Sequence, residues 1–213
     1  MALPQCVLAK NFRSLGLKHL VLILFLLITS TNVFGAKETP KSVVEKIFNQ
    51  AKNPKIAKDK TLQEKLNACI SFAEMAKSSL GKYVKSLTKD QFSWFQSTLK
   101  EIITETVYPE APDFFKNVKV EYEDEEVGKA RAEILSVVIE KGEETEVAYT
   151  LKLMQGKWKV VDVALDDESW IESIYEEVDE VMKKDKWKGL KSKLSKRLKE
   201  VRESNKKPKS KKS

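Results

Sequence analysis

The sequence predicts an α+β domain in which helices pack against one face of a curved antiparallel sheet. Apolar residues recur at helical spacing between residues 40 and 107, and again from Trp170 onward. Between Val118 and Leu165 they alternate with polar residues instead, and short turns separate the alternating stretches. This order favours N-terminal helices, an antiparallel meander of about four strands, and C-terminal helices that pack on the sheet.

The first 35 residues have the three parts of a secretory signal peptide. Basic residues precede the unbroken apolar run Leu20–Ile28, and Val33–Gly35 brings small residues to a cleavage site. An uncleaved membrane anchor is the alternative, but the run is shorter than the roughly 20 apolar residues that span a bilayer. We therefore expect residues 1–35 to be a signal peptide that is removed on export.

Capping signals place the first helices. Thr39 and Pro40 have the residue types of an N-cap and a first helical position. The capping box Thr61–Glu64 is followed by an apolar face that predicts one helix continuing toward residue 80. A second capping box, Thr88–Gln91, opens a helix that prolines stop after Val107.

Four segments alternate like strands, with turns at residues 141–144 and 155–156. The predicted strands are Val118–Tyr122, Arg131–Ile139, Val147–Leu153 and Lys157–Leu165.

The last part of the chain returns to helical spacing. An amphipathic face runs from Trp170 to Met182, with the acids of residues 166–168 at the helix N-terminus, where the dipole favours negative charge. A shorter basic helix is predicted after Gly189. Residues 204–213 have nothing to bury and are expected to be a disordered basic tail. Residues 36–203 should form a single domain.

Charge divides the chain into an acidic body and a basic end. Residues 183–213 contain fifteen Lys or Arg against three acids, although the net charge of the whole chain is only +7. Nucleic-acid binding is the usual interpretation of such a tail, but an export signal argues against it. Contact of the basic tail with an anionic membrane and a plain solvated extension both remain open.

Few residues suit catalysis or metal binding. The one histidine, His19, lies in the predicted signal, and Cys69 is the one cysteine beyond it. This excludes histidine-based triads and disfavours a zinc site, and no glycine-rich phosphate loop occurs. The acidic run Glu121–Glu126 lacks the ligand spacing of a calcium loop. We expect no cofactor and no metal, and we expect Cys69 to be buried and unreactive.

Asp162 is the one candidate for acid or base chemistry. Alternation with Trp158 and Val160 predicts that it faces the interior, where burial would raise its carboxyl pKa. No second acid or oxyanion donor can be assigned as its partner. A structural role, with hydrogen bonds to the sheet or the next helix, is therefore favoured over catalysis.

Several blocks resemble those of the MlaC/toluene-tolerance family of periplasmic phospholipid-binding transport proteins. The similar segments are Ser79–Tyr83, Thr88–Phe95, Gly156–Val163, the pair Ser169 and Tyr175, and the region around Gly189. The resemblance covers about residues 39–202. It departs from the family pattern at Asp167, Val161 and Glu176; the last replaces an arginine, so no role of that arginine carries over.

The resemblance implies a soluble periplasmic carrier, the auxiliary component of an ABC-type lipid transport system. Such a carrier moves phospholipid between an inner-membrane transporter and an outer-membrane complex. Its helices and sheet would surround an apolar cavity, because each methylene of an acyl chain costs about 0.8 kcal/mol in water. The predicted lipid-binding residues are Phe72, Phe92, Phe95, Leu99, Ile103, Tyr149, Leu151, Val161, Val163, Ile171, Ile174 and Tyr175.

Two other functions remain open at this point. One is a cone-shaped α+β enzyme with Asp162 as its general base. The other is a solid-cored adaptor that binds a membrane surface through its basic tail. Bound phospholipid would separate the carrier from both.

Overall fold

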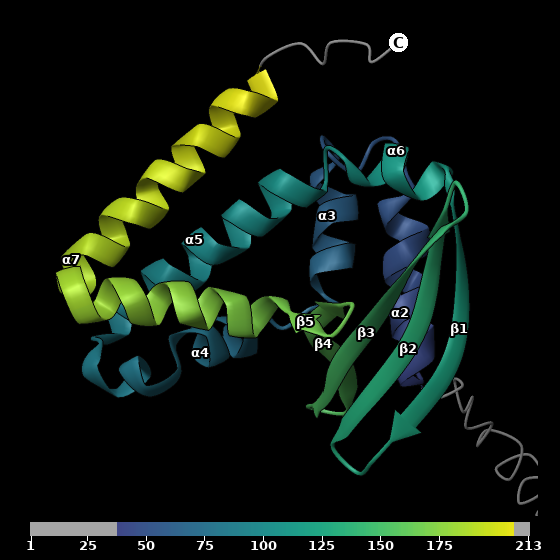
Figure 1. The fold of residues 1–213 in the computed structure, drawn as a ribbon, viewed down its shortest axis with the longest axis horizontal. Helices are drawn as coiled ribbons and strands as arrows, with labels where there is room; N and C mark the ends of the chain where they lie inside the picture. Colours follow the sequence, from purple (N-terminus) through teal and green to yellow (C-terminus); the bar gives the residue numbers. More distant parts are fainter. Residues whose placement is uncertain (1–37, 207–213) are drawn as a thin grey trace, which may run out of the picture. The chain divides into compact units, whose positions relative to one another are not determined.

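The computed structural model describes residues 38–206, so the predicted signal peptide and residues 207–213 of the predicted tail lie outside the described residues. Figure 1 shows the arrangement of the elements. The helices that precede the sheet are α2 (Pro40–Ala51), α3 (Lys60–Asn67), α4 (Phe72–Leu80), the 3-10 helix η1 (Gly81–Ser86), α5 (Lys89–Val107) and α6 (Ala111–Lys116). The sheet contains β1 (Val118–Val127), β2 (Arg131–Glu140), β3 (Glu143–Met154), β4 (Lys157–Leu165) and β5 (Glu168–Ser169), and α7 (Trp170–Lys206) follows it.

The strands form one antiparallel meander in the order β1-β2-β3-β4-β5. The predicted α+β class is therefore confirmed, with a fifth strand of two residues added at the edge. The N-cap predicted at Thr39 and the capping box predicted at Thr88 are present, and each hydroxyl accepts a hydrogen bond from the backbone of the first turn.

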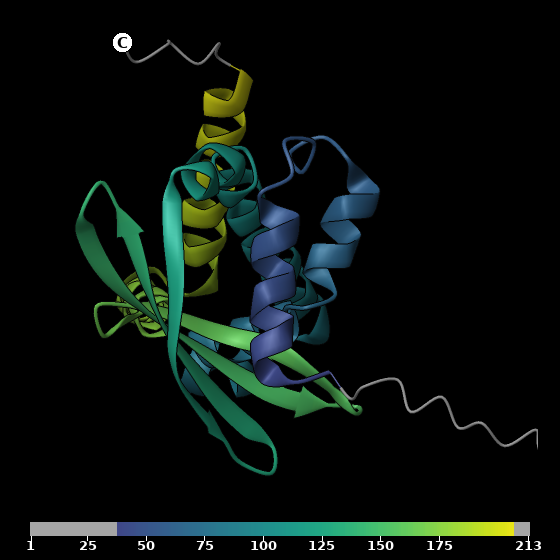
Figure 2. The ribbon, with the colours of Figure 1, turned by 90° about the vertical axis from the view of Figure 1, so that its right-hand side faces the viewer.

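One apolar core lies between α2 and the sheet. Val43 and Phe48 of α2 meet Ile134 and Leu151 of the central strands, and all four are buried. The ring of Phe48 packs edge-on against Tyr149, with 6.0 Å between the ring centroids. Figure 2 shows α2 running along the sheet.

A second core lies among α4, α5 and α7. Leu80, Phe95 and Leu190 are buried there, one from each helix. Figure 1 shows these three helices gathered beside the sheet rather than over the face that α2 covers. The domain thus has a sheet layer and a helical layer with separate apolar centres.

The helix predicted over residues 62–80 is broken. α3 ends at Asn67, α4 begins at Phe72, and Asp59 rather than Thr61 caps α3 by accepting from two backbone amides. The intervening segment pairs with the sheet: Ser71 N donates to Val160 O, and Val160 N donates to the carbonyl of the buried Cys69, each across 2.9 Å. Pairing with β4 outweighs the local helical pattern.

α7 contains a sharp kink at Lys186, whose φ of 56° and ψ of −162° are not helical. The predicted break at Gly189 is thus three residues too late. Gly189 lies inside the second half, where a Cβ would stand 2.1 Å from the Cβ of Asp185. We call Trp187–Lys206 the C-terminal arm; it continues past the predicted boundary at residue 203.

Within residues 38–206, no helix is both long enough and apolar enough to cross a bilayer. The same residues contain no group of three acidic, histidine or cysteine side chains positioned to hold a metal ion.

Candidate functional site

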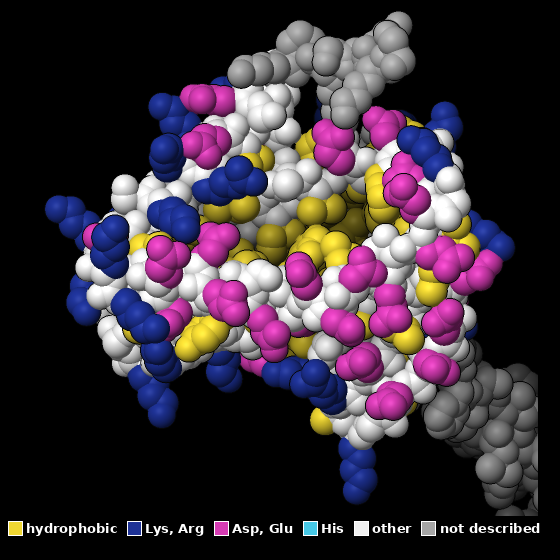
Figure 3. All heavy atoms as spheres, in the orientation of Figure 1, with side chains coloured by type: hydrophobic (Ala, Val, Ile, Leu, Met, Phe, Trp, Pro, Cys, Tyr) yellow, Lys and Arg dark blue, Asp and Glu magenta, His cyan; other side chains and the backbone are white. Residues whose placement is uncertain are grey.

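An apolar groove lies between α5 and the first half of α7. It has a volume of about 350 Å³, and Figure 3 shows the corresponding hollow with hydrophobic side chains along its walls. We call it the α5–α7 groove. Its lining residues are Ile102, Ile103, Thr106 and Val107 of α5 and Trp170, Ser173, Ile174 and Arg197 of α7.

The groove is continuous with the helical core beneath it. Ile103 and Ile174 line the groove and also pack against the buried cluster that contains Phe95 and Ile171. An apolar chain in the groove would therefore contact the same side chains that hold α5 and α7 together.

The structure separates the predicted lipid-binding residues into two groups. The group in the helical core comprises Phe72, Phe92, Phe95, Leu99, Ile103, Ile171 and Ile174, and the group on the α2 side of the sheet comprises Tyr149, Leu151 and Val163. Of all twelve, Ile103 and Ile174 line the groove. Phe95 and Leu151 are fully buried, so in this closed arrangement they fill the core. Contact with lipid stays a prediction for all twelve.

Val161 and Tyr175 belong to neither group. Val161 is the extra residue of a bulge in β4, because Thr150 pairs with Asp162 whereas the next residue, Leu151, pairs with Val160. The ring of Tyr175 lies over Gly81, where a Cβ would come within 2.5 Å of its Cε2 atom.

Several groove residues were not predicted. Ile102, Val107 and Trp170 stand on the helical faces that the sequence marks as apolar, but periodicity does not distinguish a groove wall from a core position. Arg197 is one of many basic residues after residue 183, and nothing local in the sequence singles it out.

The bulge corrects the predicted placement of Asp162. Trp158 shares a sheet face with Leu153, whereas Asp162 shares the opposite face with Thr150, so Trp158 and Asp162 do not face the same way. The half-buried Asp162 accepts hydrogen bonds from the Ser169 hydroxyl at 2.6 Å and from the Ile171 amide at 3.2 Å. These contacts support the predicted structural role, since Asp162 ties β4 to the start of α7.

The acids of residues 166–168 lie just before α7, as predicted, but they do not cap its first turn. Asp166 and Asp167 form a turn with positive φ, and Asp166 accepts from the Glu146 amide of β3. Ser169 accepts from the amide of Glu172 instead and serves as the cap. The turn acids therefore close the end of the sheet.

Asp179 of α7 connects that helix to η1. Its carboxylate contacts Lys82 at 2.6 Å and Lys183 at 2.5 Å, and it accepts a hydrogen bond from the Tyr83 hydroxyl at 2.8 Å. The hydrogen bonds from Lys183, Lys82 and Tyr83 hold the pKa of Asp179 well below its ordinary value.

The C-terminal arm folds back along α5. Arg202 donates to Glu101 at 2.6 Å and to Glu105 at 3.1 Å, and Trp187 packs edge-on against Trp94 with 5.5 Å between centroids. The arm thereby brings Arg197 to the groove.

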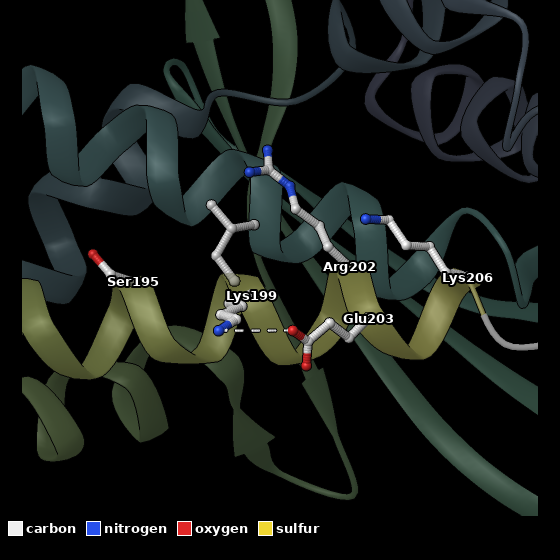
Figure 4. Close-up of a pocket in the computed structure, with 6 residues that line it drawn as sticks. Ser195, Lys199, Arg202, Glu203 and Lys206 are labelled. Carbon is white, nitrogen blue, oxygen red and sulfur yellow. Dashed lines mark ion pairs between the residues drawn. The ribbon is translucent and has the colours of Figure 1, made fainter.

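A second hollow, of about 420 Å³, lies along the arm itself. All of its lining residues come from α7, as Figure 4 shows. Arg202 points toward the neighbouring helix, and Lys199 is paired with Glu203. Its lining is mostly charged, and two of its cations already have carboxylate partners. This hollow therefore suits an apolar ligand less well than the α5–α7 groove.

Comparison with known protein families gives a match over most of the described chain. The model of the MlaC protein family matches residues 38–196. The chain belongs to the MlaC family. The match covers every element from α2 to most of α7, and so includes every residue that lines the α5–α7 groove except Arg197.

Among solved structures, the MlaC-family chain is similar to a phospholipid-binding protein from Ralstonia solanacearum, solved in complex with a phospholipid. The TM-score is 0.68 at 20% sequence identity, and the match covers 78% of this chain and 98% of the other. At this identity the likeness establishes a shared fold. A search of curated proteins gives no match.

Proposed function

We propose that this protein is a periplasmic carrier that binds the acyl chains of phospholipid and shuttles lipid between membrane transport complexes. The observation that carries the proposal is the α5–α7 groove, whose apolar walls continue into the helical core. Membership of the MlaC family and a fold shared with a phospholipid-binding protein support the same conclusion.

The groove must widen to hold a whole phospholipid. Its volume of about 350 Å³ lies near the lower end of the roughly 300–1,000 Å³ typical of small-ligand clefts. Each methylene removed from water contributes about 0.8 kcal/mol, so lipid has a strong driving force to part α5 from α7. Separation of α5 from α7 would expose Phe95, Leu99 and Ile171 to the lipid. All three are among the lipid-binding residues predicted from the sequence.

The proposed partners are phospholipid, an inner-membrane ABC-type lipid transporter and an outer-membrane lipid complex. These complexes would supply the energy and set the direction of transfer. The carrier itself would therefore need no cofactor. Asp162 gives the enzyme alternative little support, since both of its carboxyl oxygens are engaged in structural hydrogen bonds.

The test is co-purification of lipid. Residues 36–213 would be expressed with an export signal, purified without detergent, and examined by native and then denaturing mass spectrometry. We expect an added mass in the native spectrum that is recovered as phospholipid after denaturation. A mass equal to the polypeptide alone, with no uptake of lipid from vesicles, would contradict the carrier function and favour the solid-cored adaptor.

A further inference from the structure

We propose that Arg197 binds the phosphate of the lipid headgroup at the rim of the α5–α7 groove. This inference rests on the proposed carrier function and extends it, because it assigns the ligand class of one residue. The carrier would then select lipids that bear a phosphate over neutral lipids with the same chains.

Arg197 is the one charged side chain that lines the groove. The walls beside it are Ile102, Ile103, Val107, Trp170 and Ile174. Thr106 and Ser173 are the other lining residues. The Thr106 hydroxyl can donate to an anionic oxygen, whereas the Ser173 hydroxyl already donates to the Ser169 carbonyl at 2.9 Å. A cation and the Thr106 hydroxyl beside an apolar wall match the polar end of an amphiphile.

Four cations on the C-terminal arm have carboxylate partners, whereas Arg197, like Lys188, Lys191 and Lys206, has none among residues 38–206. Arg202 pairs with Glu101 and Glu105, and Lys193 pairs with Glu177. Lys196 and Lys199 pair with acids one turn further along the arm. The guanidinium of Arg197 therefore has its donors available for a ligand.

Guanidinium chemistry favours phosphate as that ligand. The planar fork of arginine can give two parallel hydrogen bonds to a phosphate, which the point charge of lysine cannot. In a phospholipid the phosphate is joined through glycerol to the acyl chains. Chains lying against Ile103 and Ile174 would thus bring the phosphate to the groove rim, where Arg197 stands.

The test compares two lipids that have the same acyl chains, one with a phosphate-bearing headgroup and one without a phosphate. The mature protein would extract a fluorescent phosphatidylglycerol, or a diacylglycerol with the same labelled chains, from vesicles of digalactosyldiacylglycerol, a host lipid that carries no phosphate. Arg197→Gln should weaken phosphatidylglycerol binding about tenfold, as expected for one charge-assisted contact at an exposed site. Diacylglycerol binding should change less than twofold, and Arg197→Lys should fall between the wild type and Arg197→Gln.

Lys188→Gln is the matched control, because it removes one positive charge from the same arm outside the groove. It should leave both affinities unchanged. Equal weakening of both lipids by Arg197→Gln, or an equal effect of Lys188→Gln, would overturn the phosphate contact. Wild-type protein that extracts neither lipid would instead overturn the carrier function.

A further experiment tests whether Arg197 binds the phosphate of a lipid headgroup or free inorganic phosphate. Titration of the protein with inorganic phosphate alone, followed by NMR of the arginine side chains, should give no saturable shift below millimolar concentration. Binding of inorganic phosphate as tight as that of phosphatidylglycerol would overturn the headgroup assignment, because the acyl chains would then contribute nothing.

Discussion

The hydroxyl of Ser169 donates a hydrogen bond to Asp162 across 2.6 Å, and this contact joins the last long strand to the helix that forms one wall of the groove. Asp162 also accepts from the backbone at the start of α7, and Ser169 caps the first turn. The pair therefore sets the direction in which α7 leaves the sheet. Its position on the sheet face opposite Trp158 follows from the bulge in β4.

Replacing Asp162 with alanine should destabilise the protein without a specific loss of lipid binding. The substitution leaves the Ile171 amide without its acceptor, and we expect a loss of about 2 kcal/mol in the free energy of unfolding. Urea unfolding followed by circular dichroism would measure it, with the exposed Glu176→Ala as control. Loss of lipid uptake by an Asp162→Asn variant that folds normally would contradict this purely structural role.

Filling the groove should block lipid uptake while leaving the fold intact. Ile103→Trp and Ile174→Trp each add an aromatic ring to a hollow of about 350 Å³, at positions that are only partly buried. We expect at least tenfold weaker lipid extraction from vesicles, at a stability cost of about 1–3 kcal/mol. Val127→Trp, at an exposed position on β1, is the control. Unchanged extraction by both groove variants would place the lipid elsewhere.

Removing Arg202 should loosen the C-terminal arm. The side chains of Arg202, Glu101 and Glu105 are all more than a third exposed, so water screens their ion pairs. Arg202→Ala should therefore lower the free energy of unfolding by only about 0.5 kcal/mol. The effect should shrink at high salt, because exposed pairs are screened. Hydrogen exchange of amides in Trp187–Lys206 would report it, and Lys188→Ala should leave their exchange unchanged.

Gly81 should tolerate no side chain. Its φ is +49°, and a Cβ would come 2.5 Å from Cε2 of Tyr175. Gly81→Ala should therefore lower stability by about 2 kcal/mol, partly from backbone conformation and partly from the clash. The double variant with Tyr175→Ala should recover the steric part alone. If the double variant is destabilised by the full sum of the two single changes, the two residues do not interact.

Stability should fall in acid partly through Asp179. Its pKa is lowered in the folded protein by Lys183, Lys82 and Tyr83, so the folded state binds its proton less readily than the unfolded chain does. The contribution is present above the unfolded pKa of about 4 and is lost as the pH falls through the lower folded pKa. Thermal unfolding from pH 6 to pH 2.5 should show a smaller decrease for Asp179→Asn than for the wild type.

The fold class, the order of the helical and strand segments, and the starts of α2, α5 and α7 could all be predicted from the sequence. These features depend on patterns within a few residues: the N-cap at Thr39, the capping box at Thr88, the alternation of the strands, and the apolar face of α7 from Trp170. Each of these features depends on residues that are close together in the sequence and lie within one helix or strand, so the local sequence is enough to predict it. The family resemblance, likewise carried by short local blocks, is confirmed.

Which residues line the groove and which fill the core depends on how the elements pack together. The break before Phe72 arises from pairing with Val160, and the orientation of Asp162 arises from the register between β3 and β4. Arg197 reaches the groove because the arm turns back at Lys186. These features depend on contacts between helices and strands that are far apart in the sequence. The pattern of residues within one element does not show which other element it will pack against.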